Sequence, residues 1–190
     1  MTETTTTIPA TLNDLSGTYT LDPTHTRIGF VARHAMVTKV RGQFNDFEGT
    51  VNVDGADLAQ SNAQLTIQAA SIDSHNDQRD AHLRSNDFLA MEEFPQITFV
   101  STGVHQSDAT TLELTGDLTI KGVTNTVTIP FQYEGAATDP FGNQRIGFEG
   151  SVTINRKDYG VTWNAALETG GVLVSEKIAL EFELSAIKNA

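Results

Sequence analysis

Carboxylate and imidazole side chains are concentrated in one polar stretch, where they could bind a metal ion. The members are Asp73, His75, Asp77, Asp80 and His82. The spacing of Asp73, His75 and Asp77 is that of an EF-hand start, but Gln78 stands where such a loop needs glycine, and no glutamate stands at the place required for a bidentate ligand. The histidines lack the HExxH spacing of zinc enzymes, and the chain has no cysteine. We therefore predict a solvated or helix-capping cluster, with no metal and no cofactor.

Asp22 and His25 lie three residues apart in turn-forming sequence and could act as an acid–base pair. The chain has neither a nucleophile elbow nor a glycine-rich phosphate loop ahead of a helix. We therefore interpret Asp22 and His25 as a turn-stabilising pair and predict a protein that is not an enzyme. An enzyme that uses His25 or His34 as its acid or base remains an alternative.

Three polar residues adjoin otherwise apolar strand faces, where they could meet the head group of a ligand. His34 ends one such face, Glu176 interrupts another, and Arg156 follows directly after Ile154. A lone buried carboxylate would protonate, so Glu176 needs a cationic partner. For Arg156 we favour a structural ion pair with Asp158.

Alternation of apolar and polar residues dominates the rest of the chain and predicts β-strands. Gly116 to Phe131 contains two such runs around Lys121-Gly122, which indicates a hairpin with Lys121 solvated at its turn. Val172 to Lys188 predicts the closing strand, with Glu176 on its apolar face. Between the hairpin and the closing strand, Arg145 to Asn155 predicts a further strand, in which Gly147 and Gly150 would allow curvature.

Two segments are less regular. Gly42 to Val53 predicts a single strand, with a bulge near Gly49 that brings Phe44 and Phe47 to the same side, and residues 36–41 predict a connection. Residues 74–89 lose the two-residue period and predict the single helix that we place, capped by Ser74.

Regularly spaced strands joined by short turns predict a sandwich or a barrel, and sequential hairpins favour an up-and-down antiparallel barrel. About eight strands leave an interior just wide enough for one small ligand. A sandwich with a filled core would show the same alternation. The apolar candidates for the lining of such an interior are Phe30, Phe44, Phe99, Phe131, Phe148, Ile154, Trp163, Val174, Ile178 and Phe182.

The chain of 190 residues has a net charge of −12, and its isoelectric point is about 4.6. An acidic surface argues against nucleic acid and against adhesion to anionic lipid. No run reaches the length of a membrane span and no secretory signal is visible, so we expect a soluble, cytoplasmic protein. We predict a disordered or loosely docked N-terminal arm over residues 1–16 and one domain over residues 17–190, with exposed edges that would permit a homodimer.

An ordered set of short motifs resembles the YceI-like family of bacterial proteins. The motifs are Asp22-Pro23-Thr24-His25-Thr26, Gly42-Gln43-Phe44, Ala70-Ser71-Ile72-Asp73-Ser74, Asp80-Ala81-His82-Leu83, Asp87-Phe88, Phe94-Pro95, Ile97-Thr98-Phe99, Gly116-Asp117-Leu118-Thr119-Ile120-Lys121-Gly122-Val123-Thr124 and Ile154-Asn155-Arg156-Lys157-Asp158-Tyr159-Gly160. The resemblance covers residues 17–188. It implies an all-β fold: an extended eight-stranded antiparallel lipocalin-like barrel with a short helical insertion.

The same resemblance implies that a long polyisoprenoid chain, such as a quinone or a prenyl carrier, binds inside the barrel. We therefore expect non-enzymatic lipid binding for storage or transport. The expected ligand-binding residues are the apolar candidates above together with His34, Arg156 and Glu176. Two alternatives remain: an enzyme acting on an isoprenoid lipid, and a stress-associated interaction protein whose barrel is filled.

Overall fold

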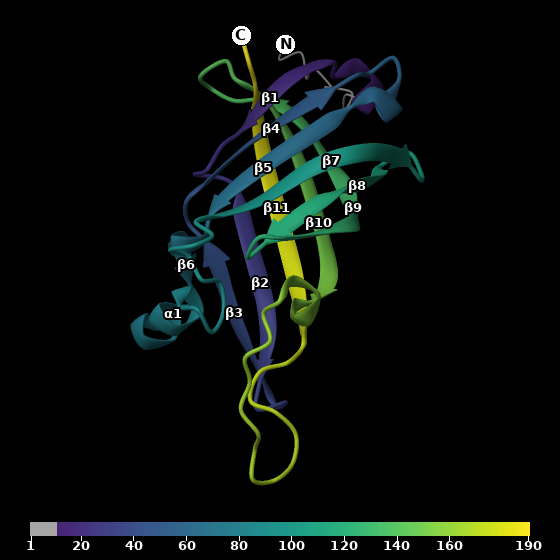
Figure 1. The fold of residues 1–190 in the computed structure, drawn as a ribbon. Coiled ribbons are helices and arrows are strands. Elements are labelled where there is room, and N and C mark those ends of the chain that lie inside the picture. The colour runs from purple at the N-terminus through teal and green to yellow at the C-terminus, as the bar shows by residue number, and fades with distance from the viewer. Residues whose placement is uncertain (1–10) are drawn as a thin grey trace.

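The computed structural model describes residues 11–190 and consists mainly of antiparallel strands (Figure 1). The strands are β1 (Gly17–Leu21), β2 (Arg27–His34), β3 (Thr38–Phe44), β4 (Phe47–Val53), β5 (Asn62–Gln68), β6 (Ile72–Asp73), β7 (Gln96–Gln106), β8 (Thr111–Ile120), β9 (Val123–Thr138), β10 (Gln144–Asn155) and β11 (Lys177–Lys188). The helical elements are α1 (Asp77–Arg84) and the 3-10 turns η1 (Leu12–Asp14), η2 (Leu58–Gln60), η3 (Ala69–Ser71) and η4 (Arg156–Tyr159).

Eight strands close into a barrel in the order β1-β4-β5-β7-β8-β9-β10-β11, because β11 pairs back onto β1. The long strand β11 pairs with two strands, β1 and β2, along the same edge. Its residues 186–188 pair with β1, and its residues 179–183 pair with β2. Strands β2, β3 and β6 therefore extend the barrel wall beyond β1, and this confirms the predicted extended eight-stranded barrel.

The β8–β9 hairpin forms where the sequence predicts it. Its ladder runs without a break from the Ile120–Val123 pair outward, and Lys121 and Gly122 take the left-handed φ values of 51° and 74° that a tight two-residue turn requires. Lys121, expected to be solvated, is half-buried and also has backbone partners. Its Nζ donates to the backbone carbonyls of Asn86 and Gly160, each at 3.3 Å, and so links the hairpin to two other segments.

The predicted single strand from Gly42 to Val53 is wrong, because it is two strands with different neighbours. Strand β3 ends at Phe44 in the extension, and β4 begins at Phe47 in the closed barrel. The break between the strands, rather than a bulge, brings both rings inside. Gly49 pairs regularly with Leu65. The expected connection over residues 36–41 is also shorter than predicted, since β3 begins at Thr38.

Residues 11–190 contain one α-helix, which forms inside the segment that the sequence indicates but is shorter. Asn76, not Ser74, caps α1 by accepting a hydrogen bond from the Arg79 amide. Ser74 instead donates through its backbone N–H and its hydroxyl to the buried Asp80 carboxylate. The helix and the chain that follows it cover one flank of the extension strands (Figure 1).

The closing strand begins later than predicted. Residues 172–176 are irregular and make only isolated bridges, such as the one between His34 and Val174, and regular pairing starts at Lys177. Glu176 therefore precedes the ladder. It lies exposed and pairs with Lys157 at 2.6 Å, so it does not interrupt the apolar face as the sequence suggested.

At the barrel end that carries the N-terminal segment, buried side chains fill the interior. Tyr19 and Ile146 are almost completely buried, and Tyr133 packs on Phe148 with ring centroids 5.6 Å apart. Of the predicted arm, residues 1–10 lie outside the described residues. The part that is described packs against the barrel, because Leu12 is buried at 2% exposure.

Candidate functional site: an apolar cavity inside the barrel

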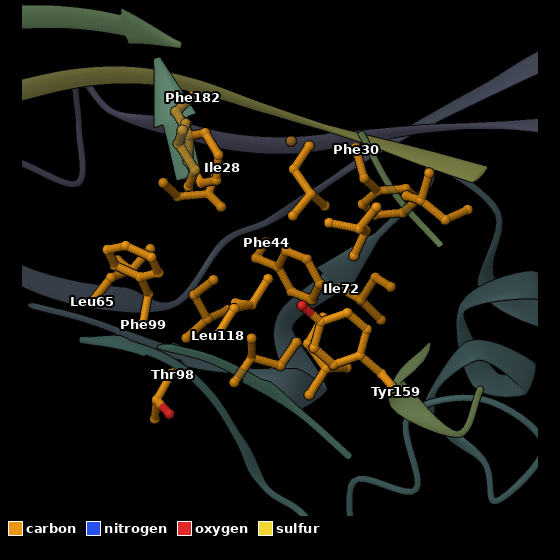
Figure 2. A pocket seen from close by; sticks show the side chains of 18 of the residues that line it. Ile28, Phe30, Phe44, Leu65, Ile72, Thr98, Phe99, Leu118, Tyr159 and Phe182 are labelled. Carbon is orange, nitrogen blue, oxygen red and sulfur yellow. The ribbon is translucent and has the colours of Figure 1, made fainter. Parts of the chain in front are cut away.

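A cavity of about 200 Å³ lies inside the barrel, between the packed end and the α1 segment (Figure 2). Side chains or backbone of every strand reach it. A volume this small that contacts so many strands is narrow and elongated. Most of the predicted ligand-binding residues line it: Phe30, Phe44, Phe99, Phe131, Ile154, Arg156, Val174, Ile178 and Phe182.

Four predicted site residues lie elsewhere. Phe148 is buried in the packed end, and Glu176 is exposed beside Lys157. His34 is exposed at the end of β2. Trp163 packs on His82 and Phe88, with ring centroids 4.6 Å and 5.4 Å apart. It therefore contacts Phe88, a residue of the cavity wall, without lining the cavity itself.

Sequence reasoning missed several residues of the lining. Leu83, Phe88 and Leu89 come from α1 and the turn after it, which close one flank of the cavity. The two-residue period that marks inward positions on strands is absent there, so no strand pattern could have identified them. The same holds for Tyr159 on η4. Leu118, Ile120 and Ile129 of the β8–β9 hairpin also line the cavity, and they stand at alternate positions of the two runs that predict this hairpin.

Large rings in the wall lie over glycines of the neighbouring strand. Gly150 is the cross-strand partner of Phe131, and a Cβ on Gly150 would come within 2.6 Å of that ring. Phe131 in turn packs against Phe182 on β11, with centroids 5.7 Å apart. The absent side chain lets the ring lie along the wall, and the cavity stays open as a result.

The η4 turn forms because its two ends are capped. The Asn155 side chain accepts a hydrogen bond from the Lys157 amide, and Gly160 ends the turn at a φ of 71°, which favours glycine. Neighbouring strands then fix the turn in place. The Asn125 side chain on β9 donates to the carbonyl of Asp158 at 2.8 Å. The turn can occupy this place because the β9–β10 ladder stops at the Phe131–Gly150 pair.

Arg156 is buried at 5% exposure and bonds only to backbone. Its guanidinium donates to the carbonyls of Val161, Trp163, Ser175 and Val174. The predicted ion pair with Asp158 is wrong; the carbonyls take that place. Burial lowers the pKa of Arg156 below its usual value, and the charge of Glu176 offsets part of that change. Arg156 thus links η4 to the start and to the end of the irregular segment over residues 161–175.

Tyr159 carries the one buried side-chain polar atom without a hydrogen-bond partner in the described part of the chain. The residue is 2% exposed, and its hydroxyl points into the cavity in the direction of Phe44 (Figure 2). Burial raises the pKa of Tyr159, so the phenol is neutral. The side-chain amide of Asn125 partly offsets that rise in pKa. One N–H of this amide donates to the Asp158 carbonyl, and the other could meet the phenol oxygen only as an acceptor, so the O–H of Tyr159 is left as a free donor.

The other polar groups flagged from the sequence lie outside the cavity. Asp22 accepts from His25 Nδ1 at 2.8 Å, as predicted, and also from Arg145 at 2.7 Å; Arg145 bridges on to Asp139 at 2.8 Å. The Arg145 guanidinium holds the pKa of both carboxyls well below their usual range. In the polar stretch, His82 pairs with Asp87 at 2.8 Å. Residues 11–190 hold no group of side chains arranged to bind a metal ion.

A sequence profile of the YceI-like domain matches residues 19–186, almost the whole of the described chain. The chain belongs to the YceI-like family. Among its relatives, a UPF0312 protein of Staphylococcus aureus strain MSSA476 is 41% identical over 169 residues, which cover 88% of this chain and 95% of the relative. A UPF0312 protein of Staphylococcus epidermidis strain RP62A is 40% identical over 169 residues, which again cover 88% of this chain and 95% of the relative.

Solved structures of YceI-like proteins share the barrel. BcnA of Burkholderia cenocepacia is 27% identical with a TM-score of 0.77, over 87% of this chain and 98% of that one. The YceI protein of Campylobacter jejuni is 28% identical with a TM-score of 0.71, over 83% and 90%. A polyisoprenoid binding domain from Saccharophagus degradans is 16% identical with a TM-score of 0.69, over 90% and 98%, and so shares the fold. No helix in the described range is long and apolar enough to cross a membrane.

Proposed function

We propose that this YceI-like protein binds a long isoprenoid lipid, such as a polyprenol or a quinone-like lipid, inside the barrel. The observation that carries the proposal is the narrow, apolar cavity, whose walls come from all strands. Apolar burial of about 25 cal/mol per Å² can hold a hydrocarbon chain without any polar motif. The slender shape suits a linear chain better than a compact ring system, and the ligand named for the Saccharophagus degradans domain agrees with this.

The role proposed is storage or transport without catalysis. The two histidines that were candidates for an acid–base role both lie away from the cavity: His25 is bonded to Asp22 with its side chain 66% exposed, and His34 is exposed at a strand end. Among the described lining residues, no carboxylate or imidazole faces the cavity. This arrangement favours binding over turnover. Cytoplasmic location and a homodimer stay predictions.

The cavity also bears on the alternative of a filled barrel. A barrel that serves only as a scaffold gains stability by packing its interior completely, and an apolar void left in a core costs roughly 24 cal/mol per Å³. At about 200 Å³ the void is too large to be an ordinary packing defect, since native interiors contain few voids larger than a water molecule. A bound chain would offset this cost.

Trp163 provides a direct test, because it is the only tryptophan in the chain and packs on Phe88, which lines the cavity. Titration with a polyprenol should change its emission saturably, with one ligand bound per chain. A soluble alcohol of the same head group without the isoprenoid tail is the control and should leave the emission unchanged. Absence of a saturable change, with the protein folded by circular dichroism, would refute the proposal.

A further inference from the structure

Two tyrosines are almost fully buried in the barrel, and their hydroxyls differ. Tyr19 donates to the carbonyl of Leu15 at 2.9 Å in the packed end. Tyr159 is buried to the same degree, but its hydroxyl has no partner among the described residues. Burying a hydroxyl without a hydrogen bond is unfavourable, so such a group in a native protein calls for an explanation.

The Tyr159 hydroxyl faces the cavity and does not pack into the barrel wall. The phenol enters from η4, which is held by Asn125 and Lys121 through backbone carbonyls, so the ring is carried by a fixed support. In Figure 2 the hydroxyl points among apolar side chains, whereas the hydroxyl of Thr98 points away from them. A water molecule needs two to four polar partners to stay in a buried site, and apolar walls offer too few.

We propose that the Tyr159 hydroxyl is the polar anchor of the cavity: it donates a hydrogen bond to an uncharged acceptor oxygen on the bound lipid. The proposal rests on the lipid-binding function above and specifies its ligand class. The class is an isoprenoid amphiphile with a carbonyl, ether or hydroxyl oxygen that enters the barrel with the chain. The barrel would thus prefer such lipids to hydrocarbons of the same length.

Two features restrict the acceptor to an uncharged group. The phenol is neutral, because burial raises its pKa, and so it is available as a donor. Arg156 is the one cation among the lining residues described, and its guanidinium already donates to backbone carbonyls. These bonds leave at most one of the five guanidinium N–H groups for a ligand, so an anionic head group brought to Tyr159 would lose its hydration without the bidentate contact that arginine gives an anion, which is unfavourable.

The test compares the isosteric variant Tyr159→Phe with the wild-type protein, using two probes of equal chain length: an isoprenoid methyl ketone and the corresponding hydrocarbon. We expect the variant to bind the ketone about tenfold more weakly, which corresponds to about 1.4 kcal/mol, and to bind the hydrocarbon unchanged. Equal loss for both probes, or no loss for the ketone, would overturn the anchor. If the wild-type protein binds neither probe, the proposed function itself fails, and that result is distinct.

Tyr19→Phe is the matched control. It should lower the urea midpoint, because it leaves the Leu15 carbonyl without its donor, while Tyr159→Phe should leave the midpoint unchanged or raise it. The infrared carbonyl band of the bound ketone gives a readout independent of affinity. It should shift to lower frequency in the wild-type protein and in Tyr19→Phe but not in Tyr159→Phe. An identical band in all three proteins would contradict the inference.

Discussion

The ring of Phe30 lies over Gly42, its cross-strand partner in the β2–β3 ladder, so closely that a Cβ on Gly42 would overlap the ring atom Cζ. Both residues belong to the extension of the barrel, and the Phe30 ring lines the cavity. The Phe30 ring can take this position only because residue 42 is a glycine and has no Cβ.

Gly42→Ala should push the Phe30 ring into the cavity. We expect a loss of about 1–3 kcal/mol in the free energy of unfolding, as for other overpacked cores, together with weaker lipid binding. Urea unfolding and the Trp163 titration measure the two effects. Gly103→Ala is the control, since apart from its two chain neighbours no atom of residues 11–190 lies within 4 Å of a Cβ at that position, and it should change neither quantity. Full lipid affinity in Gly42→Ala would show that the ring does not limit the cavity.

Phe131 and Phe148 offer a matched comparison, because both are buried at 7% exposure and only Phe131 lines the cavity. Phe148→Ala removes a ring that is packed on all sides and should cost about 3–5 kcal/mol of stability. Phe131→Ala should cost less, because a ring facing a void makes fewer contacts, but it should weaken lipid binding by about tenfold. The reverse pattern would place the ligand outside this cavity.

Arg156 distinguishes a structural role from a head-group role. Arg156→Lys keeps the positive charge but cannot reach the four carbonyls that the guanidinium bonds. We expect a loss of about 3 kcal/mol, since buried acceptors left unpaired cost about 1–3 kcal/mol each without adding fully. Hydrogen exchange should be faster over residues 161–176. Unchanged stability with lost lipid binding would instead make Arg156 a ligand contact.

The Arg145 bridge predicts how stability depends on pH. The pKa of Asp22 and of Asp139 is lowered by folding, so the stability they contribute is present above their unfolded pKa of about 3.9 and is lost as the pH falls below it. Urea midpoints measured from pH 6 to pH 2 should therefore decline below about pH 4. In Arg145→Gln this decline should be shallower, and stability near pH 7 should be lower.

Arg27→Gln serves as the control for that series. It breaks a more exposed pair with Glu181, at 3.2 Å, and exposed pairs contribute little. Its acid profile should follow the wild-type profile. An Arg145→Gln profile that also matches the wild type would mean that the two carboxylates are not stabilised by folding through Arg145.

Strand periodicity predicted the barrel wall well. The Gly116 to Phe131 hairpin forms as expected, because each alternate residue faces the interior and Lys121-Gly122 suits a tight turn. The break at residues 45–46 was missed because alternation does not reveal which neighbour a strand pairs with. The three-residue spacing of Phe44 and Phe47 does mark an irregularity, but it predicted a bulge, whereas the chain there passes from the extension into the closed barrel.

The polar part of the site was harder to predict for a different reason. Glu176 and His34 drew notice as polar residues on apolar runs, yet both are exposed because regular pairing ends beside them. Tyr159 reaches the cavity from a 3-10 turn whose place depends on where the β9–β10 ladder stops. Contacts of that kind join distant segments and leave no periodic signal in the sequence.

Native mass spectrometry of the protein purified without detergent tests the central claim most directly. We predict a mass above that of the bare chain by one isoprenoid lipid. Organic extraction should remove this excess, and added polyprenol should restore it with one molecule per chain. A protein that is isolated at the mass of the bare chain, and that takes up no polyprenol while folded, would contradict the account.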